Sequence, residues 1–114
     1  MAEIKKVTVD GTEFTFRNSF KSTRSGFSHT SEIQEGWNII AEAKCNYLNR
    51  TWESYSFQTS MKCAVENAIA QREYDLIENF KTLNGIARTS KAQKELACKD
   101  DSRIELLKKL LNEL

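Results

Sequence analysis

Residues that could carry acid–base, nucleophilic or metal chemistry are few and scattered in this sequence. His29 is the only histidine. The three cysteines, Cys45, Cys63 and Cys98, lie far apart and form no C-x-x-C pair. An odd number of widely spaced thiols favours free, structural cysteines over a disulfide framework or a zinc site. The acidic pair at 100–101 lies between two helical patterns, where helix capping explains it better than catalysis does. We therefore predict no metal, no cofactor and no enzymatic activity.

A local cluster of cations is more informative. Between residues 15 and 30 the chain has no acidic residue, and further cations follow on a later predicted strand and just beyond its end. If neighbouring strands bring these side chains together, they form a patch that binds a phosphate backbone or an acidic protein surface. An ordinary solvated polar face is the alternative. The side chains concerned are Arg17, Lys21, Arg24, His29, Lys44 and Arg50. For His29 the alternative is a half-buried strand residue, because it shares a face with Phe27 and Ile33.

The segment NYLNRTWESYSFQ, residues 46–58, combines aromatic, amide and charged side chains. One interpretation is a corner between a strand and a helix, in which Trp52 closes the end of the core and Asn49 and Thr51 satisfy turn groups. The other interpretation is a partner contact. Arg50 and Glu53 need no core, and Trp, Tyr and Arg are common anchors of protein interfaces. We therefore include Asn49, Arg50, Trp52 and Glu53 among the candidate partner-binding residues.

The elements that must position these residues begin with a hairpin. Asp10-Gly11 separates two alternating runs in VTVDGTEFTF, which predicts a two-residue turn that pairs Val9 with Thr12 and Val7 with Phe14. Strand alternation then creates one apolar face, with the cations on the opposite face. The apolar face consists of Val7, Val9, Phe14, Phe16 and Phe20.

Two more strands are predicted at 27–33 and 37–47. A three-residue loop, Gln34 to Gly36, would pair Ile33 with Trp37 and Phe27 with Ala43 and keep one apolar face. On the last strand this face would hold Trp37, Ile39, Ala41, Ala43, Cys45 and Tyr47.

Apolar residues then recur every three or four positions, which predicts a long helix within 55–84 that covers the sheet and stops at Asn84-Gly85. Arg72 and Glu73 interrupt this stripe, so a kink there is an alternative to a continuous helix. The segment 89–114 is predicted to be helical, with capping boxes at Ser90–Gln93 and Ser102–Glu105. Its leucine-rich end either docks on its own domain or pairs with a second copy in a homodimer.

Composition sets broad limits on the class of protein. The chain has 114 residues, a net charge of +1, 39% hydrophobic residues and 29% charged residues. These values predict one globular domain, residues 1–114. The strand and helix patterns described above predict its fold class as α+β: a four-stranded antiparallel meander at 1–48, a long helix, and one or two C-terminal helices. Near-neutral charge argues against a DNA mimic and a generic polybasic binder. The absence of a long apolar run or signal peptide predicts a cytoplasmic protein without membrane contact.

TRSGFSHT and KCNYLNRTWESYSFQTSM resemble a pattern of small, mostly uncharacterised proteins from bacteriophages and other mobile elements. The matching positions are Arg24, Gly26, Phe27, His29, Lys44, Tyr47, Asn49, Arg50, Thr51, Trp52, Glu53, Tyr55, Phe57 and Gln58. The resemblance spans about residues 23–69, with N-R-T-W-E as its most specific part. It implies an accessory protein that binds and inhibits a host defence complex, such as a CRISPR–Cas nuclease, without catalysis. The alternative is a small nucleic-acid-binding regulatory protein.

Overall fold

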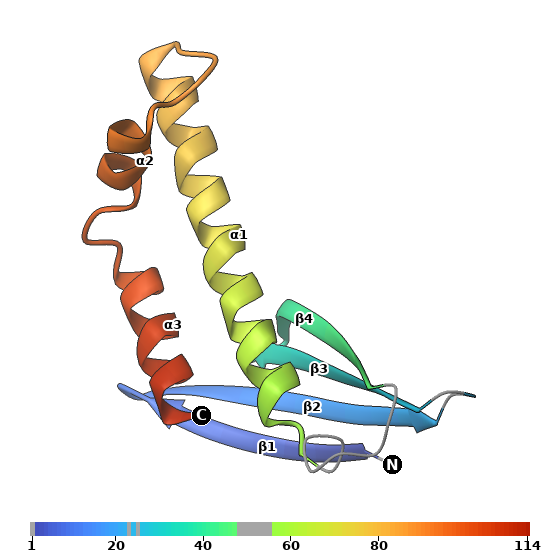
Figure 1. Ribbon diagram of the computed structural model, residues 1–114. Helices are drawn as coiled ribbons and strands as arrows, with labels where there is room; N and C mark the ends of the chain where they lie inside the picture. The colour runs from blue at the N-terminus through green and yellow to red at the C-terminus, as the bar shows by residue number, and fades with distance from the viewer. Residues whose placement is uncertain (1, 23, 25, 48–55) are drawn as a thin grey trace.

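The computed structural model describes residues 2–22, 24, 26–47 and 56–114 (Figure 1). A four-stranded antiparallel sheet, in the order β1-β2-β3-β4, is followed by three helices. This arrangement confirms the predicted α+β meander with a long helix and two C-terminal helices. The elements are β1 (Ala2–Val9), β2 (Thr12–Ser22), β3 (Phe27–Glu35), β4 (Asn38–Tyr47), α1 (Gln58–Asn84), α2 (Lys91–Cys98) and α3 (Ser102–Glu113).

The β1–β2 hairpin has the predicted turn and register. Asp10 and Gly11 both have positive φ, 49° and 82°, as a two-residue type I′ turn requires. Val9 lies opposite Thr12 and Val7 opposite Phe14, so the predicted pairing is confirmed. The apolar side of this hairpin faces the helices, and we call this side of the sheet the inner face.

The predicted β3–β4 connection was wrong. The turn consists of Gly36 and Trp37 and joins Glu35 to Asn38, and a bulge next to Ile33 brings Ile33 opposite Ala41. Phe27 accordingly lies opposite Tyr47 rather than Ala43. The bulge adds one residue to β4 and reverses its alternation.

This reversal divides the predicted apolar face of β4 into two parts. Ala41, Ala43, Cys45 and Tyr47 lie on the inner face, across from the inner-face residues of β3, as predicted. Trp37 and Ile39 do not join the core, because Trp37 is 101% exposed in the turn and Ile39 is 59% exposed. The two apolar residues nearest the hairpin tip therefore lie on the surface.

The core lies between the inner face and the helices. Phe14, Phe16 and Ile33 from the sheet are fully buried. All buried residues of α1 lie between Ser60 and Ile69, so only the first part of this helix packs on the sheet. The rest of α1 extends away from it beside α2, while α3 returns to the sheet (Figure 1). The helices supply Met61, Ala64, Val65, Ala68, Ile69, Ile104, Leu107 and Leu110 to the core.

The helix ends are defined by their caps. α1 runs without interruption to Asn84 and ends at Gly85, whose φ of 62° and bond to the Lys81 carbonyl form a left-handed cap. Ser90 and Gln93 form the predicted capping box of α2. The N-cap of α3 is Asp101, not the predicted Ser102: its carboxylate accepts from the Ile104 N–H at 3.0 Å.

The C-terminal helix α3 docks on its own chain. Ile104, Leu107 and Leu110 are buried in the same core as the sheet residues. Lys109 also forms an ion pair with Asp10 in the β1–β2 turn. The apolar face that was considered for a homodimer is thus occupied within the chain. In the described part of the chain, no helix is long and apolar enough to cross a membrane.

Candidate functional site

The candidate interaction surface is the side of the sheet that faces away from the helices, which we call the outer face. All described helices lie on the inner side of the sheet, and none covers this face (Figure 1). Strand alternation and the pairing register determine which side chains it presents. They are Ala2, Ile4, Lys6, Thr8, Glu13, Thr15, Arg17, Ser19, Lys21, Ser28, Thr30, Glu32, Gln34, Ile39, Glu42, Lys44 and Asn46.

Positive charge gathers at the end of this face next to the β2–β3 loop. Lys21 heads the row Lys21–Ser28–Asn46, and Lys44 ends the adjacent row Ser19–Thr30–Lys44. Two strand spacings separate Ser19 from Lys44, roughly 10 Å. Arg24 is exposed in the loop beyond Lys21. We call Lys21, Arg24 and Lys44, with the hydroxyl and amide groups between them, the basic end.

Arg17 lies at the border of this basic end. Its row continues through Glu32 to Glu42, so Arg17 has an acidic neighbour on β3. Glu32 and Glu42 lie directly opposite each other, an arrangement that costs stability unless a cation offsets it. Arg17, next to Glu32, is placed to reduce this repulsion. The outer face therefore has a basic end and an acidic row, not one continuous basic patch.

His29 lies on the inner face and cannot contribute to this surface. Its side chain is buried, with 2% of the residue exposed. Its ring centroid lies 5.0 Å from that of Tyr47 and 4.7 Å from that of Phe57. The odd-numbered residues of β3 all point inward, which corrects the inclusion of His29 among the partner contacts. Asn49, Arg50, Trp52 and Glu53 lie outside the described residues, as does the predicted strand-to-helix corner.

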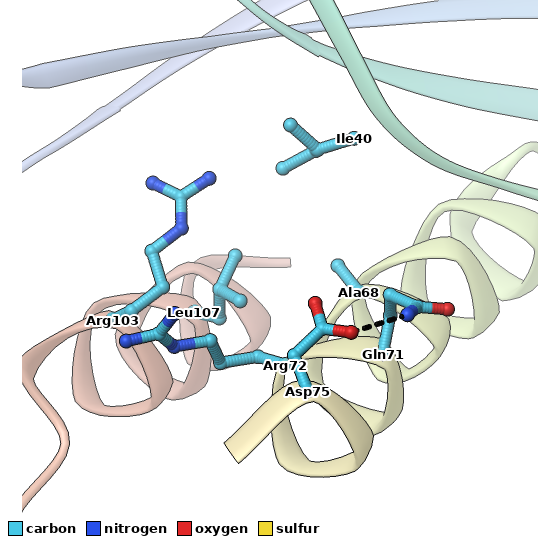
Figure 2. A pocket seen from close by; sticks show the side chains of 7 residues that line it. All are labelled: Ile40, Ala68, Gln71, Arg72, Asp75, Arg103 and Leu107. Carbon is cyan, nitrogen blue, oxygen red and sulfur yellow. Dashed lines mark hydrogen bonds between the residues drawn. The ribbon is translucent and has the colours of Figure 1, made fainter. Parts of the chain in front are cut away.

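A cavity of about 340 Å³ opens between α1, α3 and β4 (Figure 2). Its two arginines are already engaged. Arg72 donates two hydrogen bonds to Asp101, at 3.1 and 2.9 Å, and Arg103 donates to Glu35 at 2.5 Å. Gln71 donates to Asp75 at 3.0 Å. Because each of these charges has a partner, the polar groups of this cavity join elements of the fold rather than await a ligand.

The bonds from Arg72 lower the pKa of the Asp101 carboxyl, helped by its bonds to the backbone N–H groups of Ile104 and Arg103 and opposed by partial burial. Arg72 and Arg103 tie α3 to α1 and to the sheet, respectively. These two ion pairs hold the helical layer over the inner face. The described helices therefore do not contact the outer face.

Cys45 of β4 and Cys63 of α1 meet at the junction of helix and sheet. Burial raises the pKa of the Cys45 thiol, and the neighbouring Cys63 thiol raises it further by charge repulsion and hydrogen bonding. The wide spacing in sequence concealed this proximity. Both cysteines are free, as predicted. Among the described residues, no group of three or more histidine, cysteine or acidic side chains could hold a metal ion.

Several large apolar side chains are exposed, and the sequence did not indicate this for those on the sheet. Ile4 and Ile39 lie on the outer face, and Trp37 lies in the β3–β4 turn. Tyr74, Leu83 and Leu96 are exposed on the part of the helices that extends from the sheet. Exposed aromatic and aliphatic side chains are suited to protein contacts.

No protein-family model matches this chain, and neither the curated proteins nor the solved structures contain a significant match to it.

Proposed function

We propose that this protein is an accessory protein of a bacteriophage or another mobile element that binds a host defence complex and inhibits it without catalysis. A CRISPR–Cas nuclease is the leading candidate target. The observation that carries the proposal is the one-sided sheet, whose outer face combines a basic end with exposed apolar side chains. The resemblance of N-R-T-W-E and its flanking residues to mobile-element proteins supports the biological setting.

The basic end suits a nucleoprotein target. Lys21, Arg24 and Lys44 offer charged donors, and Ser19 and Thr30 add hydroxyl groups in the same area. Such groups bind phosphate oxygens through charge-assisted hydrogen bonds. Ile39 and Trp37 at the other end of the face would contact a protein surface. A guide RNA held by its effector protein presents both kinds of surface together.

The test is the plating efficiency of a phage that the CRISPR system of the host cell targets. Expression of the wild-type protein is expected to raise plating efficiency. The combined variant Lys21→Gln, Arg24→Gln, Lys44→Gln, which we call the outer-face variant, is expected to lose this effect, because it removes the three cations of the basic end. Arg88→Gln, Lys91→Gln, Lys94→Gln is the matched control, since it removes the same charge from exposed positions next to and within α2. No effect of the wild-type protein on any CRISPR type tested would contradict the proposed target.

A pull-down from lysate of the same host separates the target classes. We expect a Cas protein to be retained after nuclease treatment by the wild-type protein and by the control variant, and to be lost with the outer-face variant. Equal retention by all three proteins would show that binding does not use the outer face.

Direct nucleic-acid binding is the second candidate function. The basic end favours it, because hydroxyl and amide side chains that reach the surface lie between the cations and suit contacts with phosphates (Ser19, Thr30 and Asn46). Three cations that each neutralise one phosphate would give a slope of roughly −2 to −3 in log K against log salt. Fluorescence anisotropy with labelled single-stranded RNA would measure it. A slope of this size, with no protein retained after nuclease treatment, would favour this function over inhibition.

A further inference from the structure

The two edge strands of the sheet, β4 and β1, differ in how closely the rest of the fold contacts them. At one edge, α1 packs against β4. The Asn67 side chain of α1 donates a hydrogen bond to the Glu42 carbonyl of β4 at 2.9 Å. On β1, by contrast, every residue from Ala2 to Lys6 is exposed, and the far end of this strand contacts the core through Val7 and Val9. The first half of β1 is therefore an open strand edge, which is suited to pairing with another strand.

The turn geometry identifies the backbone groups that this edge presents. A two-residue type I′ turn is closed by a hydrogen-bonded pair, here Val9 and Thr12. Hydrogen-bonded and non-hydrogen-bonded pairs alternate along an antiparallel ladder. The odd-numbered residues of β1 therefore bond to β2. The N–H and C=O groups of the even-numbered residues, Ala2, Ile4 and Lys6, point away from the sheet.

We propose that this edge pairs with β1 of a second copy of the chain, antiparallel and with Ile4 opposite Ile4 of the second copy. This register places outward-pointing residues opposite one another, so that Ala2 faces Lys6 and both bond across the new edge. It also places Glu3 of each copy opposite Lys5 of the other, on the inner side of the joined sheet. The two Ile4 side chains, each 64% exposed in one chain, cover each other on the outer side.

Charge selects this register over its neighbours. A symmetric pairing centred on Glu3, Lys5 or Lys6 puts identical charges directly opposite each other, which destabilises a strand pair. Centring on Ile4 instead creates two opposite-charge pairs, one on each side of the axis. The sequence AEIKK, residues 2–6, is thus self-complementary in one antiparallel register.

The pairing would join two sheets into one, with both outer faces on the same side. The basic ends of the two copies would then flank a common surface. This inference depends on the edge of β1 and not on the proposed function, so either can fail without the other.

Sedimentation velocity at protein concentrations from micromolar to millimolar tests the proposal. Charge variants of β1 distinguish pairing through this edge from association through another surface. The wild-type protein is expected to shift from one to two chains as concentration rises. Glu3→Lys places a second lysine opposite Lys5, and Lys5→Glu places a second glutamate opposite Glu3. Each variant alone should therefore dimerise at least about tenfold more weakly. An equimolar mixture should recover dimerisation, because every cross-strand charge pair between the two variants is attractive.

Lys94→Glu and Glu95→Lys are the controls, since they change the same charges at exposed positions of α2. They should dimerise as the wild type does. Circular dichroism of each variant checks that it is folded, and recovery in the mixture also excludes misfolding as the cause of a loss. A wild-type protein that stays a single chain at millimolar concentration would overturn the proposal. A mixture that dimerises no better than its components would overturn the register.

Discussion

Arg72 of α1 holds Asp101 through two hydrogen bonds, from Nε to Oδ2 at 3.1 Å and from Nη2 to Oδ1 at 2.9 Å. The same Oδ2 accepts from the Ile104 N–H at 3.0 Å and caps α3. One carboxylate therefore begins α3 and fixes it against α1. Since α3 contributes three buried residues to the core, this contact influences how the whole helical layer is seated on the sheet.

Substitutions at Asp101 should separate capping from charge. Asp101→Asn keeps a good N-cap but loses the charge, and because Arg72 is partly exposed we expect a loss of about 0.5–1 kcal/mol in the free energy of unfolding. Asp101→Ala loses both the N-cap and the charge, and it should lower the free energy of unfolding by about 1–3 kcal/mol. Urea unfolding followed by circular dichroism measures both. Asp75→Asn is the control, because this carboxylate bonds Gln71 at the surface and its loss should cost less than about 0.5 kcal/mol.

Acidification should reduce the difference in stability between the wild-type protein and Asp101→Asn. The pKa of Asp101 is lower in the folded protein than its ordinary value of 3.8, chiefly through the bonds from Arg72. A lowered pKa stabilises the folded state above the ordinary value, and this stabilisation is lost as pH falls through the folded value. We therefore expect the two proteins to differ in urea midpoint at pH 7 and to converge as the pH falls progressively below 3.8. A difference that stays constant over this range would show that ionisation of Asp101 contributes little.

A buried hydroxyl pair predicts unequal effects of two serine substitutions. Ser31 of β3 and Ser60 of α1 are fully buried, with their oxygens 2.6 Å apart. Ser60 donates its proton to the Phe57 carbonyl at 3.0 Å, so Ser31 must be the donor within the pair. Ser60→Ala removes the acceptor of Ser31 and should cost about 1–3 kcal/mol. Ser31→Ala leaves Ser60 bonded and should cost about 0.5–1.5 kcal/mol.

The double variant completes this cycle. Ser31→Ala with Ser60→Ala should cost no more than Ser60→Ala alone, because no hydroxyl is then left without a partner. Unfolding free energies from urea titration give the coupling, with exposed Ser19→Ala as the control. Additive costs would contradict the contact between the two hydroxyl groups, and a larger cost for Ser31→Ala than for Ser60→Ala would contradict the assigned direction of the hydrogen bond.

The parts of the fold that the sequence predicted correctly have strong local signals. Asp10-Gly11 determines the first turn, and because the turn fixes the register, the whole β1–β2 pairing follows from it. The β3–β4 register lacked such a signal. Ile39, Ile40 and Ala41 are consecutive apolar residues, so alternation alone does not indicate which of them faces inward. The choice depends on tertiary packing, since Ile40 lies beside Ala68 and Leu107 in the cavity between the layers (Figure 2).

The error in the predicted β3–β4 register also changed which side chains were expected to lie side by side on the outer face. Alternation alone placed Arg17, Lys21 and Lys44 on the outer face, independently of how β3 pairs with β4. The predicted register would have put Glu42 opposite Ser28, whereas the bulge puts it opposite Glu32. The acidic row next to the basic end therefore arises from a one-residue bulge. His29 was misassigned for another reason: it was grouped with the cations by its charge, although its strand face already pointed inward.

The thiol of Cys45 should react slowly, and Cys63 should be part of the reason. Burial and the neighbouring Cys63 thiol raise the pKa of Cys45 above its ordinary value of 9.0, which lowers the fraction of reactive thiolate at neutral pH. Cys63→Ser removes the repulsion between the two sulfur atoms, so alkylation of Cys45 by iodoacetamide at pH 8 should accelerate at least about twofold. Peptide mass spectrometry measures each site separately, which makes Cys98 an internal control. Its pKa is raised by burial, Glu73 and Asp101, not by Cys63, so its rate should not change. If Cys45 and Cys98 accelerated equally, the variant would have loosened the fold in general, and the specific contact between Cys45 and Cys63 would be contradicted.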